Sequence, residues 1–311
     1  MKKILSYISN FIRKDFTWGT YAVVLIFLST FIALNYYFTI ENGIITKEEN
    51  ALIRFLLYLI LYSTAYYGTL AVYYFIDKTN YFSNKEVMVK SSLALLLLSF
   101  DGAFVVSKAF MQSQFLMTAA NAKYSAKLVN QALPTLIYLF FIVVINKKYN
   151  TTSSSLYGLT TRGFHWKPYF TMLLLMLPLL LWASFQVSFA QQYPFFKYWN
   201  YDSAFGLSQK QLFLIYEFFY LFNFVNVELL FRGLLIIGMI KCMGNKAVLP
   251  MIVTYAFLHF GKPTPETISS AIGGYILGII AYQTKNIFGG LLIHICIALV
   301  MDVLAIGRVH L

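Results

Sequence analysis

Apolar segments of about the length that a bilayer requires recur along this chain of 311 residues. An α-helix needs roughly 20 predominantly apolar residues to cross the hydrocarbon core, and about nine stretches approach that length. They lie at 20–40, 53–76, 91–110, 133–146, 169–189, 212–240, 247–260, 267–284 and 287–306. Two of them, 133–146 and 247–260, are short, which leaves eight spans and one re-entrant segment as an alternative. The pattern predicts an all-α fold, a polytopic transmembrane helical bundle of about eight to nine spans.

The composition supports a membrane protein and argues against a soluble one. The chain is 59% hydrophobic and only 12% charged, whereas a soluble domain is about 45–50% apolar and about 25% charged. The net charge of +12 is therefore read as a topology signal and not as a sign of nucleic-acid binding. The two cysteines, Cys242 and Cys296, form neither a disulfide framework nor a Cys-rich metal site. The expected partner is the lipid bilayer, and no nucleic acid is expected.

The distribution of Lys and Arg predicts the orientation. If all nine stretches span, the side of the N-terminus holds about twice as many Lys and Arg residues as the other side. By the positive-inside rule this places the N-terminus in the cytoplasm, where the basic segment 1–16 is expected to lie at the membrane surface. Usage rich in Lys, Asn, Ile and Phe is typical of AT-rich bacterial genomes. The expected location is the cell (inner) membrane, as a multi-pass protein.

The chain also divides by pattern into two regions. Residues 1–150 form an N-terminal transmembrane region of about four spans without a recognisable motif, and 151–311 carry every motif described below. The longest polar stretch, about 147–167, is interpreted as the connector between them.

Ionisable side chains inside the apolar segments are costly, by about 2.5–3.5 kcal/mol each, and are functional hypotheses by default. They are Arg54, Asp101, Lys108, Glu217, Glu228, Arg232, His259, His294 and Asp302. Arg54 and Glu217 lie near the ends of their segments and are expected to reach the interface, and Asp302 is expected to reach water. Asp101 and Lys108, seven residues apart on one expected span, are interpreted as a structural ion pair.

Glu228 and Arg232 lie four residues apart in N-V-E-L-L-F-R-G. This spacing puts both side chains on one helical face within reach of each other, and a mutually neutralised pair costs far less to bury than either charge alone. Two later apolar segments each carry a histidine, His259 and His294. One carboxylate and two imidazoles gathered in a bundle can hold and deprotonate a water, or supply donors to an oxyanion.

These motifs resemble those of the CPBP family (CAAX protease and bacteriocin-processing, also called Abi), which includes the type II CAAX prenyl endopeptidases. That family shows Glu-Glu-x-x-x-Arg on one transmembrane helix, Phe-x-x-x-His on the next and a later His-x-x-x-Asn. The corresponding pieces are V-E-L-L-F-R-G (227–233), Y-A-F-L-H (255–259) and H-I-C-I-A (294–298), with the Gly-rich G-G-Y-I-L-G (273–278) between the last two. The resemblance covers roughly residues 157–306.

The resemblance implies an intramembrane endopeptidase (a hydrolase) in which Glu228, Arg232, His259 and His294 are the catalytic residues. His259 would partner the base, His294 would be an oxyanion donor and Arg232 would anchor Glu228.

Two departures argue against activity. Val227 stands where the family has its first glutamate, and Ala298 stands where it has asparagine. Glu228 does not simply replace its neighbour, because adjacent helical residues point about 100° apart.

Three functions therefore stay open. The first is a peptidase with an altered geometry, for which no cofactor is expected. Its metal variant uses Glu228, His259 and His294 as the two-His, one-carboxylate set of a catalytic zinc. The second is a non-catalytic homologue, a pseudoenzyme, which binds a transmembrane or lipidated peptide or a partner protein. The third is a transporter, against which the lack of matching broken helices in two halves argues.

Overall fold

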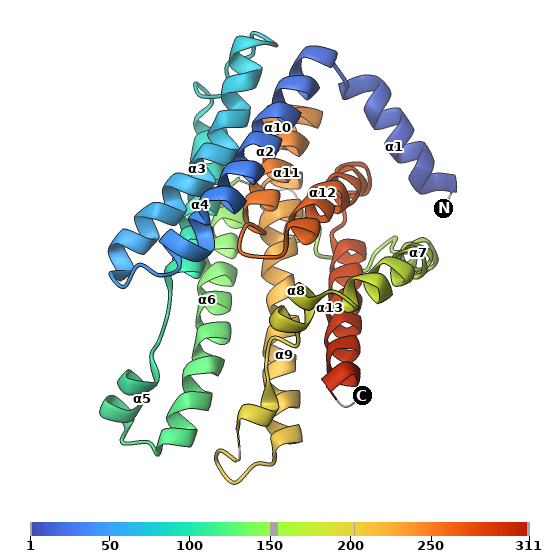
Figure 1. The fold of residues 1–311 in the computed structure, drawn as a ribbon. Coiled ribbons are helices and arrows are strands. Elements are labelled where there is room, and N and C mark those ends of the chain that lie inside the picture. The colour runs from blue at the N-terminus through green and yellow to red at the C-terminus, as the bar shows by residue number, and fades with distance from the viewer. Residues whose placement is uncertain (1, 150–154, 202, 310–311) are drawn as a thin grey trace. The chain divides into compact units, whose positions relative to one another are not determined.

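A computed structural model describes residues 2–149, 155–201 and 203–309. These residues form helices joined by loops, with no β-strand among them, and the predicted all-α fold is confirmed (Figure 1). The α-helices are α1 (Lys2–Asp15), α2 (Trp18–Phe38), α3 (Ala51–Phe75), α4 (Lys85–Ala103), α5 (Lys108–Phe115), α6 (Ala119–Tyr149), α7 (Trp166–Ser184), α8 (Val187–Gln192), α9 (Gln209–Glu228), α10 (Ile240–Met243), α11 (Val248–Phe257), α12 (Thr264–Thr284) and α13 (Phe288–Val309). Two π-helical turns, η1 (Ile40–Ile45) and η3 (Leu229–Leu234), and three short 3₁₀ turns, η2 (Tyr198–Asn200), η4 (Ile237–Met239) and η5 (Gly244–Ala247), complete the set.

The chain divides into two compact units, each assembled from segments that are distant in sequence. The first unit comprises the residues up to Ala103, Ile142–Phe164 and Glu228–Gly290, and the second comprises Phe104–Phe141, His165–Val227 and the residues from Leu291 onward. The boundary predicted from the sequence pattern, between residues 150 and 151, falls outside the described residues. That division stays a prediction.

By length and apolar composition, six helical segments of the described chain can cross a membrane, or seven if α4 and α5 together make one span. The six are Trp18–Phe38, Ala51–Phe75, Ala119–Tyr149, Trp166–Ser184, Gln209–Phe257 and Phe288–Arg308. The polytopic helical bundle is confirmed, with fewer qualifying spans than the eight to nine expected.

Three physical reasons account for the difference in number. The stretch expected at 91–110 is interrupted after Ala103, where α4 ends. The stretch expected at 212–240 and most of the stretch expected at 247–260 belong to one long helical segment, Gln209–Phe257, in which α11 alone has only 10 residues. The stretch at 267–284 forms α12, whose small and hydroxyl-bearing residues are suited to helix contacts more than to lipid.

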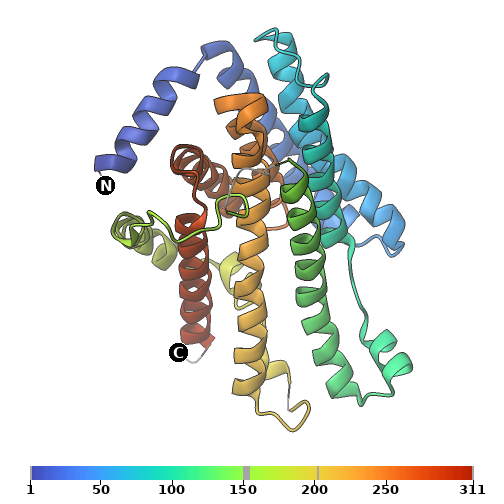
Figure 2. The same ribbon diagram turned by 180° about the vertical axis from the view of Figure 1, so that it is seen from behind.

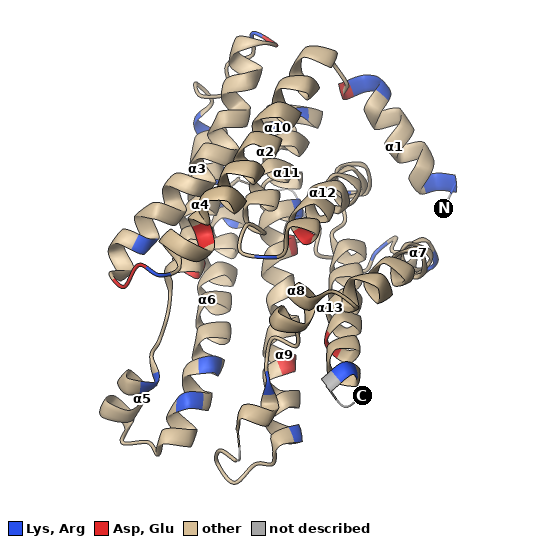
Figure 3. Cartoon of the chain, viewed as in Figure 1, with Lys and Arg blue, Asp and Glu red and all other residues tan. Residues whose placement is uncertain are grey.

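The outer faces of the helices are apolar. On α7, for example, Leu175, Leu179 and Trp182 are each more than half exposed, and Lys, Arg, Asp and Glu residues are sparse along most helices (Figure 3). Exposed apolar area of this extent is unfavourable in water and favourable against hydrocarbon chains. The structure therefore implies a lipid environment.

In the first unit, α11 and α12 pack closely because α12 carries glycines where α11 approaches. A Cβ atom at Gly274 would lie 3.0 Å from the Tyr255 ring, and one at Gly278 would lie 2.8 Å from Met251 Cε. Gly274 and Gly278 form a G-x-x-x-G pair, the arrangement that lets transmembrane backbones approach each other. The Gly-rich segment noted in the sequence is thus a helix-packing surface.

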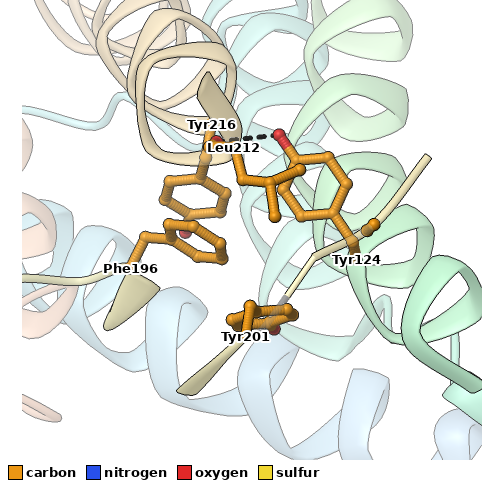
Figure 4. Packing of buried hydrophobic residues seen from close by; sticks show 6 residues of the cluster. Tyr124, Phe196, Tyr201, Leu212 and Tyr216 are labelled. Atoms are coloured by element: carbon orange, nitrogen blue, oxygen red, sulfur yellow. Dashed lines mark hydrogen bonds between the residues drawn. The ribbon is translucent and has the colours of Figure 1, made fainter. Parts of the chain in front are cut away.

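In the second unit, aromatic rings from several segments form a buried cluster (Figure 4). Phe196 stacks on Tyr216 with ring centroids 4.6 Å apart and packs against Tyr201 at 4.9 Å. Tyr124 donates a hydrogen bond to the Leu212 carbonyl at 2.8 Å, which satisfies its buried hydroxyl. The same unit places α13 alongside α9, as seen from behind in Figure 2.

A buried acid lies directly after α2. Glu41, in the π-turn η1, is only 8% exposed, and its carboxylate accepts hydrogen bonds from the Tyr58 hydroxyl, at 3.4 Å, and from the Gly261 backbone N–H. Burial raises the pKa of Glu41 to about 7, against the opposing effects of these hydrogen bonds and of Lys262. The folded state therefore keeps this proton to a higher pH than the unfolded chain.

Replacing Gly274 by alanine should lower the free energy of unfolding by about 1–3 kcal/mol, because the new methyl group overpacks the contact with Tyr255. Gly273→Ala is the matched control: a Cβ at this adjacent position meets nothing within 4 Å, so helix propensity should leave it neutral or stabilise it by up to about 1 kcal/mol. Thermal unfolding in detergent compares the two. Equal effects would contradict the close approach of α11 and α12.

Glu41 should make stability fall as pH rises. The protonated Glu41 carboxyl adds to the free energy of unfolding, and this addition is fully present below the unfolded-state pKa of about 4.5. It is lost as pH rises through the folded-state pKa of about 7, which lowers the free energy of unfolding by up to about 3 kcal/mol. Glu41→Gln, which keeps the shape without the charge, should remove this part of the pH dependence between pH 5 and 8. Glu49→Gln, at an exposed acid, serves as the control. Parallel pH profiles for the wild type and Glu41→Gln would show the prediction to be wrong.

Candidate functional site

Glu228 and Arg232 form an ion pair inside the first unit. Glu228 is the last residue of α9, and Arg232 lies in the π-turn η3 that follows. Their closest charged atoms, Glu228 Oε1 and Arg232 Nη1, are 3.2 Å apart, and the two side chains are 0% and 1% exposed. The reach expected from the i, i+4 spacing is confirmed, and each charge offsets the burial cost of the other.

The π-turn after Glu228 is closed by a hydrogen bond from the Leu235 N–H to the Leu230 carbonyl at 2.9 Å. Tyr157, in the loop before α7, packs against this part of the chain: a Cβ at Gly233 would lie 3.0 Å from Tyr157 Cβ, and one at Gly238 would lie 2.8 Å from its ring. The glycine of the F-R-G motif therefore makes room for a fully buried tyrosine. Isolated π-turns occur frequently at functional sites.

Tyr255 joins the Glu–Arg motif to the first histidine motif. The Arg232 guanidinium lies over the Tyr255 ring at 4.4 Å from its centroid, in a cation–π contact. The His259 ring meets the same tyrosine edge-on, with centroids 4.6 Å apart. The aromatic residue at the start of Y-A-F-L-H thus contacts both the cation and the imidazole, a role that the sequence did not reveal.

The ring of His259 is held by the backbone of the preceding helix, α11. Its Nδ1 lies 2.8 Å from the Tyr255 carbonyl oxygen, and because a carbonyl only accepts hydrogen bonds, Nδ1 carries the proton. Nε2 is then the nitrogen with the lone pair, which suits it to accept a proton or to bind a donor.

Gly290 is a second site residue that sequence reasoning missed. A Cβ at this position would lie 2.3 Å from Glu228 Oε2 and 2.9 Å from its carboxyl carbon, so only glycine allows α13 to begin against the carboxylate. The available signal was the Gly289-Gly290 pair four residues before His294. Together with Arg232, Gly290 encloses the Glu228 carboxylate.

His294 and Ala298 belong to the second unit, four residues apart on α13. The His294 ring stacks on Phe224 of α9 with centroids 5.7 Å apart, and Ala298 is buried at 5% exposure. The structure thus brings Glu228, Arg232 and His259 together around Tyr255 in the first unit. The meeting of these three with His294 stays a prediction.

A metal site stays a prediction as well. Within the described residues of each unit, no three His, Cys, Asp or Glu side chains are grouped so that they could hold a metal ion. The zinc set of Glu228, His259 and His294 would draw on both units.

Other charged residues differ from their expected roles. Asp101 and Lys108 lie on two different helices and not on one, because α4 ends at Ala103 and α5 begins at Lys108. Glu217 and Asp302 do not reach the surface: they are 6% and 2% exposed and lie close enough to interact electrostatically within the second unit. The sequence pattern missed this because the two residues meet through the packing of α9 on α13.

The fold and these contacts define a class: a polytopic helical membrane protein with a buried Glu–Arg pair linked through an aromatic ring to a histidine. Residues 209–300 match the family model described as Rce1-like, Type II CAAX prenyl endopeptidase Rce1-like. This match confirms the resemblance to the CPBP family over the segment that contains Glu228, Arg232, His259 and His294. No curated protein and no solved structure matches the chain.

Removing the cation of the buried pair should destabilise the protein. Arg232→Met leaves the Glu228 carboxylate buried without its partner and should cost about 3–5 kcal/mol. The double variant Glu228→Gln, Arg232→Met removes both charges and should recover most of that loss. Arg162→Met, at an exposed arginine, is the control. Unfolding midpoints in detergent give the comparison, and a double variant no more stable than Arg232→Met would contradict the pairing.

Proposed function

We propose that this chain is a non-catalytic CPBP-type membrane protein that binds a lipidated or transmembrane peptide without cleaving it. The observation that carries the proposal is the enclosure of the Glu228 carboxylate, which is 0% exposed, paired with Arg232 and packed against Gly290. A general base must reach a water molecule and take its proton. The Glu228 carboxylate, enclosed by Arg232 and Gly290, serves better as a structural anchor.

The two departures from the family motif support the same conclusion. Val227 is half-buried and has no group that accepts a proton, and Ala298 has no group that donates a hydrogen bond. The loss of a general base costs about 10²–10⁴-fold in rate, and the loss of one oxyanion donor about 10²–10³-fold. Both losses together would remove most of a peptidase's rate enhancement.

The proposed ligand class follows from the matched family and from the surroundings. The family description names a prenyl endopeptidase, and a prenyl chain is an apolar tail of the kind that a helical bundle in lipid accommodates. This chain retains four residues of the motif segments: Glu228, Arg232, His259 and His294. We infer that these residues hold the helices in a binding arrangement, with the N-terminus on the cytoplasmic side of the cell membrane, as the bias of Lys and Arg favours.

A second candidate is a working intramembrane endopeptidase. The hydrogen bond between His259 Nδ1 and the Tyr255 carbonyl favours it, because in a neutral ring this bond leaves Nε2 as the proton acceptor. In this alternative His259 would take the proton of the attacking water, and Glu228 would act through its charge.

Binding and cleavage of one peptide separate the two candidates. The full chain in detergent is titrated with a fluorescent peptide that ends in a farnesylated Cys-a-a-X motif, and anisotropy and mass spectrometry report binding and cleavage. We expect saturable binding that weakens at least about tenfold, or about 1.4 kcal/mol, without the farnesyl group. The peptide should stay intact with the wild type, Glu228→Gln and His259→Ala.

Cleavage by the wild type that is lost in both variants would overturn the non-catalytic proposal. Equal affinity for the farnesylated and unmodified peptides would overturn the proposed ligand class.

A further inference from the structure

The loop that contains His259 is held from outside its own motif. This histidine loop, residues 258–263, joins α11 to α12 in the first unit. Two side chains from the C-terminal end of α2 bind its backbone: Asn35 Nδ2 donates to the Phe260 carbonyl at 3.0 Å, and the Tyr36 hydroxyl donates to the Lys262 carbonyl at 2.7 Å. Asn35 is 3% exposed, so its hydrogen bond forms away from water.

The π-turn η1 binds the middle of the same loop. Asn42 Nδ2 donates to the Gly261 carbonyl at 3.3 Å, and the Glu41 carboxylate accepts from the Gly261 N–H. Asn35 Oδ1 in turn accepts from the Glu41 backbone N–H at 3.1 Å, which fixes the turn that presents Glu41. Three consecutive loop carbonyls and one loop N–H are therefore bound by side chains from 35–42.

A third element ties this set directly to the histidine. The Tyr36 hydroxyl lies 2.6 Å from the Thr267 hydroxyl, and Thr267 Oγ1 donates to the His259 carbonyl. Thr267 is fully buried on the first turns of α12. Two successive hydrogen bonds, through Thr267, thus link the backbone of His259 to Tyr36 near the other end of the chain.

The fit between Glu41 and Gly261 is close. A Cβ at Gly261 would lie 3.0 Å from Glu41 Oε1 and 3.2 Å from its carboxyl carbon. A buried acid is costly in a membrane protein, and a simple anchor for α2 would not require one. The Glu41 carboxylate occupies the space next to the backbone that a side chain at position 261 would fill.

We infer that Asn35, Tyr36, Glu41 and Asn42 form a clamp that positions the histidine loop, so that the N-terminal region, which lies outside the family match, sets the placement of His259. The clamp residues are positioning residues: they act on the site through the loop backbone. The effect on peptide binding rests on the proposed function, and the effect on the loop does not.

Amide hydrogen exchange on the full chain tests the clamp directly. Tyr36→Phe removes one hydroxyl and should raise exchange in peptides covering 258–267 by about two- to tenfold, with no change in peptides from α9. Tyr37→Phe removes a hydroxyl from the adjacent tyrosine, which is 81% exposed, and should leave exchange unchanged. Glu41→Ala should loosen the loop, and Glu41→Gln, which keeps an oxygen that accepts from Gly261, should restore it.

A double-variant comparison tests the contact itself. Gly261→Ala alone should raise loop exchange, because the methyl group displaces Glu41. In the Glu41→Ala background the same change should have little further effect, because the crowded atoms are gone. Fully additive effects would contradict the contact.

Affinity for the farnesylated peptide extends the test to the site: Tyr36→Phe should weaken binding several-fold while Tyr37→Phe leaves it unchanged. Equal loop exchange in Tyr36→Phe and Tyr37→Phe, or a rise spread evenly over the chain, would overturn the clamp. Failure of every protein, the wild type included, to bind the peptide would overturn the proposed function, and the exchange data would still decide on the clamp.

Discussion

The buried ion pair between Glu228 and Arg232 is the constraint on which the site depends. Neither charge is tolerable alone in a low-dielectric interior, and the pair is acceptable because the two groups meet at 3.2 Å with almost no exposure. The surrounding residues follow from this requirement. Tyr255 covers the guanidinium with its ring, and Gly290 lets a helix backbone lie against the carboxylate.

Close contacts between glycines and tyrosines recur around this pair. Tyr157 packs against Gly233 and Gly238, and Tyr255 packs against Gly274. In a membrane the hydrophobic effect does not drive helices together, so dense packing of this kind must supply the association. Gly233 of the F-R-G motif and Gly274 of the G-G-Y-I-L-G motif are then explained by the tyrosines that they accommodate. In this chain, these motif glycines serve helix packing.

The sequence allowed the all-α membrane fold, the Glu228–Arg232 pair and the family resemblance to be predicted, because hydropathy and helical spacing are local properties. It did not reveal the roles of Tyr255, Gly290 or the 35–42 clamp, since these contacts join segments up to about 220 residues apart. The end of α4 at Ala103 was also missed, because the apolar pattern continues through it. Periodicity predicts which residues are apolar together, and it does not predict which segments pack against one another.

The π-turn at 229–234 has a consequence for how this protein tolerates change in length. Its hydrogen bond spans five residues where an α-helix spans four, so the turn contains one residue more than an α-helical turn would. Deleting a single residue here would let the turn close as a regular α-helical turn, and because the π-turn holds its extra residue locally, the helix on either side would stay nearly in phase. A deletion between Glu228 and Arg232 would change their spacing from i, i+4 to i, i+3, which still places both side chains on one helical face. The π-turn is therefore a point at which this chain can lose one residue and keep its buried pair.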